Sequence, residues 1–304
     1  MTTNSAIALF GYAILLSTLT FQAAQATPII MEGNFVRTAV SDDGTLGYGD
    51  QISPGLQHDV SGTGNFPIND YLTPGSPWEL FSVRSDQSGL QSNNNALNDS
   101  ISGVLTDTSR SSVYDFSINW QGTYGSYYSL STDTFFNDGD ERISMVTTIQ
   151  ALANLTGLSF LRSIDPDQDN GFGGSADTNN VRGSADRAPE DWVFAVGPVS
   201  DLAIGLYSND SIKHNTGISS AWSKDPLSYL AGINNGNGDY TIGLAFDLGS
   251  LTKGDSVSFN YHYVMGDTLD TVDLPTAVPE PASIALLGFG LAGIGFTRKK
   301  KSDC

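Results

Sequence analysis

The chain has 304 residues and a formal net charge of −19, from 33 acidic residues against 14 basic ones. Such an excess of negative charge repels nucleic-acid phosphates, so we exclude a nucleic-acid partner. The single cysteine, Cys304, leaves no pair for an internal disulfide, so the stability of the fold must come from a large core.

The first 26 residues have the composition of a secretory signal. An apolar stretch runs from Ala6 to Phe21, and the small residues Ala24 and Ala26 suit the subsites of signal peptidase. We therefore expect an N-terminal signal helix over residues 1–26, cleaved after Ala26. No Lys or Arg precedes the stretch, so the positive charge at the start of this signal comes from the α-amino group alone. A retained membrane anchor is the alternative, but an anchor needs about 20 apolar residues, more than this stretch offers.

In the body of the chain, period-two alternation predicts antiparallel strands. In Val113–Trp120 the large apolar side chains would share one face and the polar side chains the other. The same alternation predicts three further strands, Asp191–Val196, Asp239–Leu248 and Ser256–Val264. The segment Ile143–Leu161 favours strand over helix because it contains several β-branched residues, with a turn at Asn154–Gly157.

These strands predict an all-β fold, a single large antiparallel β-sandwich over residues 27–275. Aromatic rows such as Phe259, Tyr261 and Tyr263 are expected in its core or in cross-strand ladders. The part before Ser109 is rich in Ser, Asn and Gly and less regular, so an edge sheet or a loosely packed cap is predicted there.

A row of alternating carboxylates follows the Ile143–Leu161 segment. Asp165, Asp167 and Asp169 can converge on one cation when the chain curls, and Gly171 permits a tight turn. Hard oxygen ligands in this number favour calcium, so these three residues are the predicted Ca²⁺ ligands.

The spacing departs from that of an EF-hand, because the glycine falls one place late and no glutamate closes the loop. A further ligand from Asp177 or from the acidic cluster 138–141 would complete the site. The alternative interpretation is a turn whose carboxylates accept hydrogen bonds from backbone N–H groups, with Arg162 paired to one of them.

The C-terminal residues 276–304 form a three-part tail. A Pro-Glu-Pro sequence precedes the apolar run Ala282–Phe296, and a basic cluster ends the run. The prolines favour an extended backbone, and the run of about 15 residues predicts a short hydrophobic helix of about 23 Å, a marginal membrane span. The residues that carry this pattern are Pro279, Glu280, Pro281, Arg298, Lys299 and Lys300.

This tail resembles the PEP-CTERM sorting signal of Gram-negative bacteria. The resemblance implies transient anchoring in the inner membrane, recognition by an exosortase near Pro-Glu-Pro, and release or transfer to the cell surface or the extracellular space. A permanent anchor is one alternative. A sortase motif at Leu274–Ala277 is another, but it lacks the Thr-Gly that such a motif requires at the right positions.

The pattern from Asn154–Gly157 through Arg162 to Ala195–Gly197 resembles the supersandwich domains of some bacterial surface proteins, which share an architecture with galactose mutarotase. Three histidines, His58, His214 and His262, are widely spaced and lack metal-binding spacing. No Gly-x-Ser-x-Gly element is present, so no catalytic residue is predicted.

The predicted function is therefore that of an exported, exosortase-sorted surface or matrix protein with a non-catalytic acidic domain. The resemblance to the sorted family implies contact with exopolysaccharide in a biofilm. A secreted carbohydrate-active enzyme on a β-sandwich scaffold is the alternative, because the two carboxylates of a glycosidase need not be close in sequence.

Overall fold

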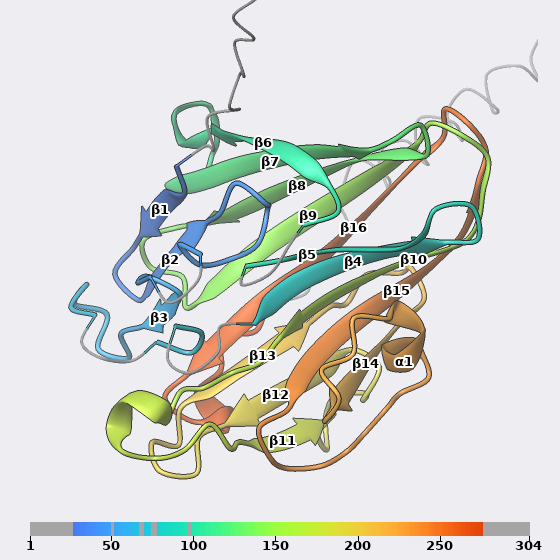
Figure 1. Cartoon of the computed structure of the whole chain (residues 1–304). Coiled ribbons are helices and arrows are strands. Elements are labelled where there is room, and N and C mark those ends of the chain that lie inside the picture. Colours follow the sequence, from blue (N-terminus) through green and yellow to red (C-terminus); the bar gives the residue numbers. More distant parts are fainter. Residues whose placement is uncertain (1–26, 50–51, 67–69, 74–77, 96–98, 276–304) are drawn as a thin grey trace, which may run out of the picture.

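The computed structural model describes residues 27–49, 52–66, 70–73, 78–95 and 99–275. The predicted signal helix and the predicted C-terminal hydrophobic helix both lie outside the described residues. Strands dominate the described chain and form three antiparallel sheets (Figure 1). Within these ranges, no helix combines the length and the hydropathy that a membrane span requires. The prediction of an all-β antiparallel sandwich is confirmed.

The five-stranded sheet has the order β14-β15-β10-β4-β5. Its strands are β4 (Glu79–Ser85), β5 (Gly89–Asn94), β10 (Leu155–Ile164), β14 (His214–Ser219) and β15 (Thr241–Leu251). The eight-stranded sheet has the order β11-β12-β13-β16-β9-β8-β7-β6. Its strands are β6 (Ser102–Asp107), β7 (Phe116–Tyr124), β8 (Tyr128–Phe136), β9 (Arg142–Ala151), β11 (Asn179–Arg182), β12 (Trp192–Val196), β13 (Ala203–Tyr207) and β16 (Ser256–Gly266).

The two larger sheets face each other, and the main core lies between them (Figure 1). Rings from both sheets meet in this core: the ring centroid of Phe259 on β16 lies 4.5 Å from Phe246 and 5.0 Å from Phe160. Phe81 on β4 meets Trp120 on β7 at 5.3 Å. The aromatic rows therefore fill the core, as their period-two spacing predicts.

A smaller three-stranded sheet of β1 (Ile29–Glu32), β2 (Val36–Val40) and β3 (Leu56–His58) covers one end of the sandwich. The turn after β2 enters the sandwich, because the Nε1 of Trp120 donates to the carbonyl of Asp42 at 2.9 Å. Gly44 in this turn has a φ of +84° and lies against the Trp120 ring, so a side chain there would collide with the indole.

A buried ion pair within the five-stranded sheet contacts the chain that follows β2. Arg162 on β10 and Glu79 on β4 are both fully buried, and Arg162 donates to Glu79 from Nε and, at 2.9 Å, from Nη2. Glu79 also accepts from the backbone N–H of Leu46 at 2.7 Å and from the hydroxyl of Tyr263 at 2.5 Å. Every oxygen of this carboxylate is therefore used, which offsets the cost of burying the charge.

Three sequence predictions differ from the structure in detail. The strand predicted at Val113–Trp120 begins at Phe116. The segment Ile143–Leu161 covers two consecutive strands, β9 in the eight-stranded sheet and β10 in the five-stranded sheet, and the connection between them lies before Leu155. The part before Ser109 is not only an edge or a cap, because β4 lies inside the five-stranded sheet between β10 and β5. Its seven residues are almost all buried, and pairing with distant strands determines that position.

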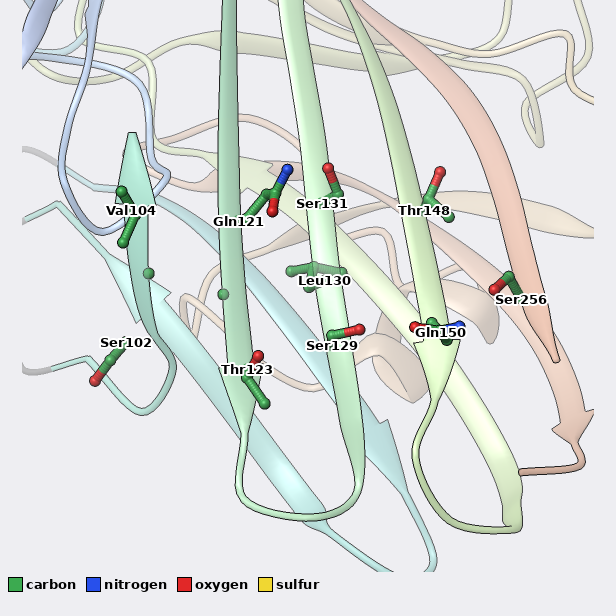
Figure 2. Close-up of a pocket in the computed structure, with 12 residues that line it drawn as sticks. Ser102, Val104, Gln121, Thr123, Ser129, Leu130, Ser131, Thr148, Gln150 and Ser256 are labelled. Carbon is green, nitrogen blue, oxygen red and sulfur yellow. The ribbon is translucent and has the colours of Figure 1, made fainter. Parts of the chain in front are cut away.

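The outer face of the eight-stranded sheet carries a shallow trough of about 640 Å³ over β6, β7, β8, β9 and the start of β16. Figure 2 shows its side chains on neighbouring strands. No residue that lines the trough is charged.

The described chain ends against the body of the sandwich. Val272 and Leu274 pack on a small cluster of buried residues that includes Trp192 on β12. Between them, Asp273 accepts a hydrogen bond from Arg142, and its backbone N–H donates to the carbonyl of Met265 at 3.2 Å. The chain is thus held to the domain as far as Leu274.

Candidate metal centre

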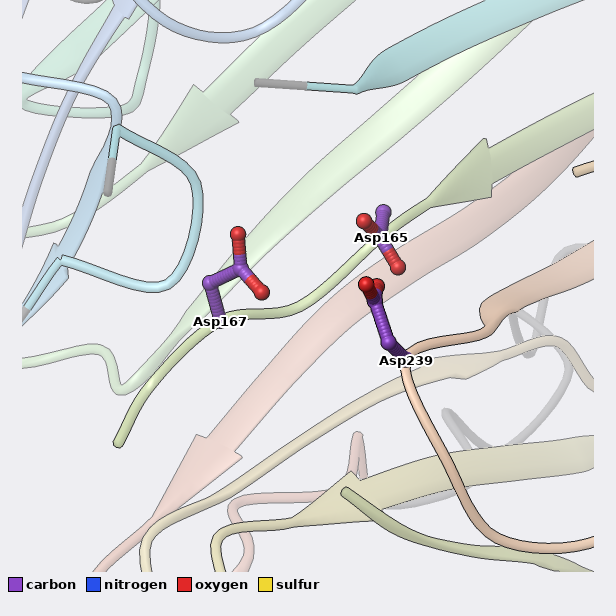
Figure 3. A group of neighbouring side chains, drawn as sticks. All are labelled: Asp165, Asp167 and Asp239. Atoms are coloured by element: carbon purple, nitrogen blue, oxygen red, sulfur yellow. The ribbon is translucent and has the colours of Figure 1, made fainter. Parts of the chain in front are cut away.

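Three aspartates meet at one end of the five-stranded sheet. Asp165 and Asp167 follow β10, and Asp239 precedes β15 (Figure 3). One carboxylate oxygen from each lies within 4.8 Å of the corresponding oxygens of the other two. We call these residues the acidic corner. Figure 3 shows the carboxylates of Asp165 and Asp239 turned toward each other from the two chain segments.

Strand pairing explains why residues so distant in sequence meet. β10 and β15 are antiparallel, with Ile164 opposite Ile242, so the end of one strand lies beside the start of the other. Pro166 favours an extended conformation for Asp165, and in an extended chain the side chains at i and i+2 lie on the same side. Their backbones are fixed as well. The N–H of Asp165 donates to the carbonyl of Trp78 and the N–H of Asp167 to the carbonyl of Tyr71, each at 2.8 Å.

The carboxylates of Asp165 and Asp167 are buried, with 2% of each residue exposed. The Oδ1 atoms of both have no hydrogen-bond partner among the described residues. Burial raises the pKa of Asp165 to about 9, and repulsion from Asp167 and Asp239 adds to the shift. Burial and Asp239 raise the pKa of Asp167 to about 8. Ionised carboxylates are therefore unfavourable here unless a cation balances them.

The donor set has the chemistry of a site for a hard cation. Three carboxylates offer up to six oxygens, and Ca²⁺ takes six to eight oxygen ligands in flexible geometry, with water filling open positions. Asp239 is exposed, so the acidic corner opens to solvent on its side and an ion has a path to enter. The unpartnered oxygens of Asp165 and Asp167 are the atoms that such an ion would satisfy.

Asp169, the third predicted ligand, lies outside the acidic corner. Its two carboxylate oxygens accept hydrogen bonds from the backbone N–H groups of Val199 at 2.6 Å and Ser200 at 3.0 Å. Gly197 packs so closely against this carboxylate that an added Cβ would lie 2.4 Å from Oδ1. Asp169 thus closes a turn, which is the alternative role that the sequence suggested for the whole segment.

The other residues named for this site lie elsewhere. Asp177 is exposed and accepts a hydrogen bond from Ser175 at 3.0 Å, and it is not part of the acidic corner. Glu141, from the acidic cluster 138–141, contacts the Nε2 of His58 at 3.0 Å. The prediction that Arg162 pairs with one of the aspartates is wrong, because Arg162 pairs with Glu79.

Asp239 was missed as a ligand by sequence reasoning. It lies at the end of the Asn- and Gly-rich segment before β15, where a turn and the start of a strand were the evident features. Only the pairing of β15 with β10 places it beside Asp165, and a single sequence does not reveal that pairing. Its backbone carbonyl accepts a hydrogen bond from the Nε1 of Trp222 at 3.1 Å, so an indole lies beside the acidic corner.

The three histidines each have a separate structural partner. The Nδ1 of His214 contacts the carbonyl of Ile212 at 2.6 Å, and the Nδ1 of His262 contacts the hydroxyl of Ser144 at 3.0 Å. Burial lowers the pKa of His262 to about 4, and Arg142 adds to the shift, so the ring is neutral at physiological pH. His58, His214 and His262 therefore have local roles in packing and hydrogen bonding.

Comparison with known proteins gives one result for the tail, a sequence motif, and another for the body, a similar fold. Residues 277–300 match the model of the PEP-CTERM protein-sorting motif. No curated protein matches the chain in sequence. Among solved structures, a bacterial glucoamylase complexed with acarbose is similar over 88% of this chain and 35% of its own, at 13% identity and a TM-score of 0.50. This chain thus spans about a third of that enzyme, and the likeness shows the fold alone.

Two further structures have lower scores. A putative aldose 1-epimerase from Escherichia coli K12 is 12% identical over 82% of this chain and 99% of its own, with a TM-score of 0.38. An alpha-mannosidase from Enterococcus faecalis V583 is 10% identical over 81% of this chain and 30% of its own, also with a TM-score of 0.38. The chain thus carries an antiparallel β-sandwich and a PEP-CTERM protein-sorting motif, which indicates an exosortase-sorted surface protein.

Proposed function

We propose that this protein is exported, sorted by an exosortase and displayed at the cell surface or in the extracellular matrix as a non-catalytic β-sandwich that binds Ca²⁺. The observation that carries the proposal is the sorting motif at residues 277–300. The unpartnered buried carboxylates of the acidic corner support the calcium site.

In this proposal the chain has three parts. Signal peptidase removes residues 1–26 after Ala26, residues 27–275 form the displayed domain, and residues 276–304 serve as the sorting tail. The tail anchors transiently in the inner membrane until the exosortase acts near Pro279, Glu280 and Pro281, while the cluster Arg298–Lys300 holds the last residues on the cytoplasmic side.

Calcium would connect two segments that are far apart in the sequence, the one after β10 and the one before β15. The ion would satisfy Asp165 and Asp167 after β10 and Asp239 before β15, and so hold the ends of two paired strands together. No disulfide can hold these strand ends together, because the single cysteine of the chain, Cys304, lies in the sorting tail. Ion binding stabilises the folded state. Once the free calcium concentration exceeds the dissociation constant, the gain grows with the logarithm of their ratio.

The sorting part of the proposal is tested by the masses of the exported and cell-associated forms. We expect the exported form to begin at Thr27 and to end near Pro279. Replacing Pro279 and Pro281 together with alanine should leave the tail attached and hold the protein in the membrane fraction. Ser302→Ala, beyond the basic cluster, is the control and should be processed normally. Export of the double alanine variant with the tail removed would contradict the proposal.

The calcium part is tested with terbium, which replaces calcium at oxygen-rich sites and emits when a nearby tryptophan is excited. Trp222 contacts the backbone of Asp239, so the full chain should show sensitised terbium emission that calcium competes away. Asp239→Asn should abolish the emission, whereas Asp177→Asn should keep it. Equal emission from both variants would place the ion elsewhere and refute this site.

The alternative is a carbohydrate-active enzyme, and glycoside hydrolysis ordinarily requires two facing carboxyl groups. The trough on the eight-stranded sheet has no carboxylate in its lining. A second hollow of about 650 Å³ has three, Asp140, Glu141 and Asp273. Of these, however, Asp273 is paired with Arg142, and Glu141 contacts His58. The enzyme alternative predicts release of reducing sugar from polysaccharide by the wild-type protein. Contact with extracellular polysaccharide, without its cleavage, remains part of the proposed function.

A further inference from the structure

The trough on the eight-stranded sheet consists of rows of uncharged polar side chains. Pairing of neighbouring strands places five residues in one row across β6, β7, β8, β9 and β16. This first row is Ser102, Thr123, Ser129, Gln150 and Ser256. A second row lies beside it, and Figure 2 shows four of its residues, Val104, Gln121, Ser131 and Thr148.

The two rows differ in how their polar groups are used. In the second row, Gln121 donates to Asn119 at 2.8 Å and Thr148 contacts Ser258 at 3.0 Å. In the first row, none of the five side chains has a hydrogen bond to another described residue. Each hydroxyl of this row can donate and accept, and the amide of Gln150 adds two donors and one acceptor. The first row is therefore a line of free hydrogen-bonding groups at the surface.

The dimensions of the row suit an extended polymer. Neighbouring strands lie about 4.8 Å apart, so five strands spread the row over about 19 Å. The strand spacing is comparable to the length of one pyranose unit, so successive sugars of a chain that crosses the strands would meet successive side chains.

Charge and composition select the kind of partner. The chain has a net charge of −19, which repels polyanions, yet no residue that lines the trough is charged. A protein partner would need apolar or aromatic anchors, and among the outward-facing residues of the lining only Val104 is a large apolar side chain, with 66% of it exposed. Leu130 also lines the trough, but 2% of it is exposed.

We propose that this trough binds an uncharged polysaccharide that lies across β6 to β9 and β16, with Thr123, Ser129 and Gln150 at its centre. This inference names the surface and the class of polysaccharide for the contact in the proposed function, and it rests on that function. No aromatic side chain lines the trough to stack on a sugar face, so each site binds weakly. Several sites along one polymer raise the overall avidity.

Affinity electrophoresis of the full chain tests this proposal, because it detects weak binding to a polymer cast in the gel. Dextran and galactomannan are the uncharged probes, and alginate is the polyanionic control. We expect retardation by at least one uncharged probe and none by alginate. The triple variant Thr123→Ala, Ser129→Ala and Gln150→Ala should bind about tenfold more weakly, because it loses three hydrogen-bonding side chains.

Thr106→Ala is the matched control, since Thr106 is an exposed β6 residue outside the trough. It should bind like the wild type. Asp165→Asn should also bind normally, which separates this proposal from the calcium site. The proposal is refuted if neither uncharged polymer retards the protein, or if the triple variant is retarded as much as the wild type. The proposal is also refuted if the wild type sediments as a dimer and the triple variant as a monomer, because the trough would then bind a second copy of the chain.

Discussion

Replacing Asp165 with asparagine is expected to stabilise the calcium-free protein and to remove its response to calcium. The pKa of Asp165 is raised from 3.8 to about 9, so at neutral pH the folded protein holds a proton that the unfolded chain releases. Holding that proton costs about 4 kcal/mol at pH 7. Asparagine has no proton to hold, but its buried amide must find partners, so we expect a net gain of about 2 kcal/mol.

The sign of the pH dependence follows from the same shift. The stability that a protonated Asp165 contributes is fully present below a pH of about 4 and is lost as the pH rises toward 9. Calcium binds the ionised carboxylates, so its stabilising effect should grow over the same range. At a calcium concentration about one hundred times the dissociation constant, the gain is about 2.7 kcal/mol.

Thermal unfolding of the full chain, with a chelator or with millimolar calcium, measures both effects. A change of about 2 kcal/mol shifts the melting temperature of a domain of this size by roughly 4–8 °C. Wild type should gain this much with calcium near pH 8 and much less near pH 5, whereas Asp165→Asn should start higher and gain nothing. Asp177→Asn, at an exposed aspartate outside the acidic corner, should behave like wild type. A lower melting temperature for calcium-free Asp165→Asn, or a calcium response in that variant, would refute the reasoning.

Two further predictions concern the fold. Glu79→Gln should lower the free energy of unfolding by about 3–5 kcal/mol in urea, because it leaves a buried guanidinium without its counterion, whereas the exposed Glu32→Gln should cost less than about 1 kcal/mol. Gly197→Ala should cost about 2 kcal/mol, because its Cβ would collide with the carboxylate of Asp169, and Gly139→Ala, where nothing lies within 4 Å, should be neutral. Equal urea midpoints within either pair would contradict the corresponding argument.

Local alternation in the sequence was enough to predict the strands with strong aromatic patterns. The predicted strand Ser256–Val264 agrees with β16 to within two residues, and Phe259 and Tyr261 face the core as the period of two requires. The pattern succeeds where a strand has one buried face and one face open to solvent, as in the first part of β16, where burial alternates. β12 and most of β15 are buried on both faces.

Features that depend on strand pairing could not be read from the sequence. Glu79 and Arg162 form the most buried ion pair in the described part of the chain. Sequence reasoning noticed Arg162 but assigned it to a nearby aspartate, because nothing in the local sequence shows that β4 pairs with β10. The same reason applies to Asp239, whose partners lie more than 70 positions earlier in the chain. The Asp165–Asp169 segment was recognised because three aspartates alternate, but alternation alone does not say which carboxylate points into the corner and which closes a turn.

The way in which the described chain ends limits how the sorting enzyme approaches its substrate. Leu274 is packed on the domain, and only four residues separate it from Pro279. Even fully extended, the five Cα-to-Cα steps from Leu274 to Pro279 reach about 17 Å. If the enzyme cuts beside Pro279, it must therefore work close to the surface of the folded sandwich. The released protein would keep only a few residues beyond Leu274, too few to form a flexible arm. Insertion of a long spacer at residue 276 would give the enzyme freer access without altering the sandwich.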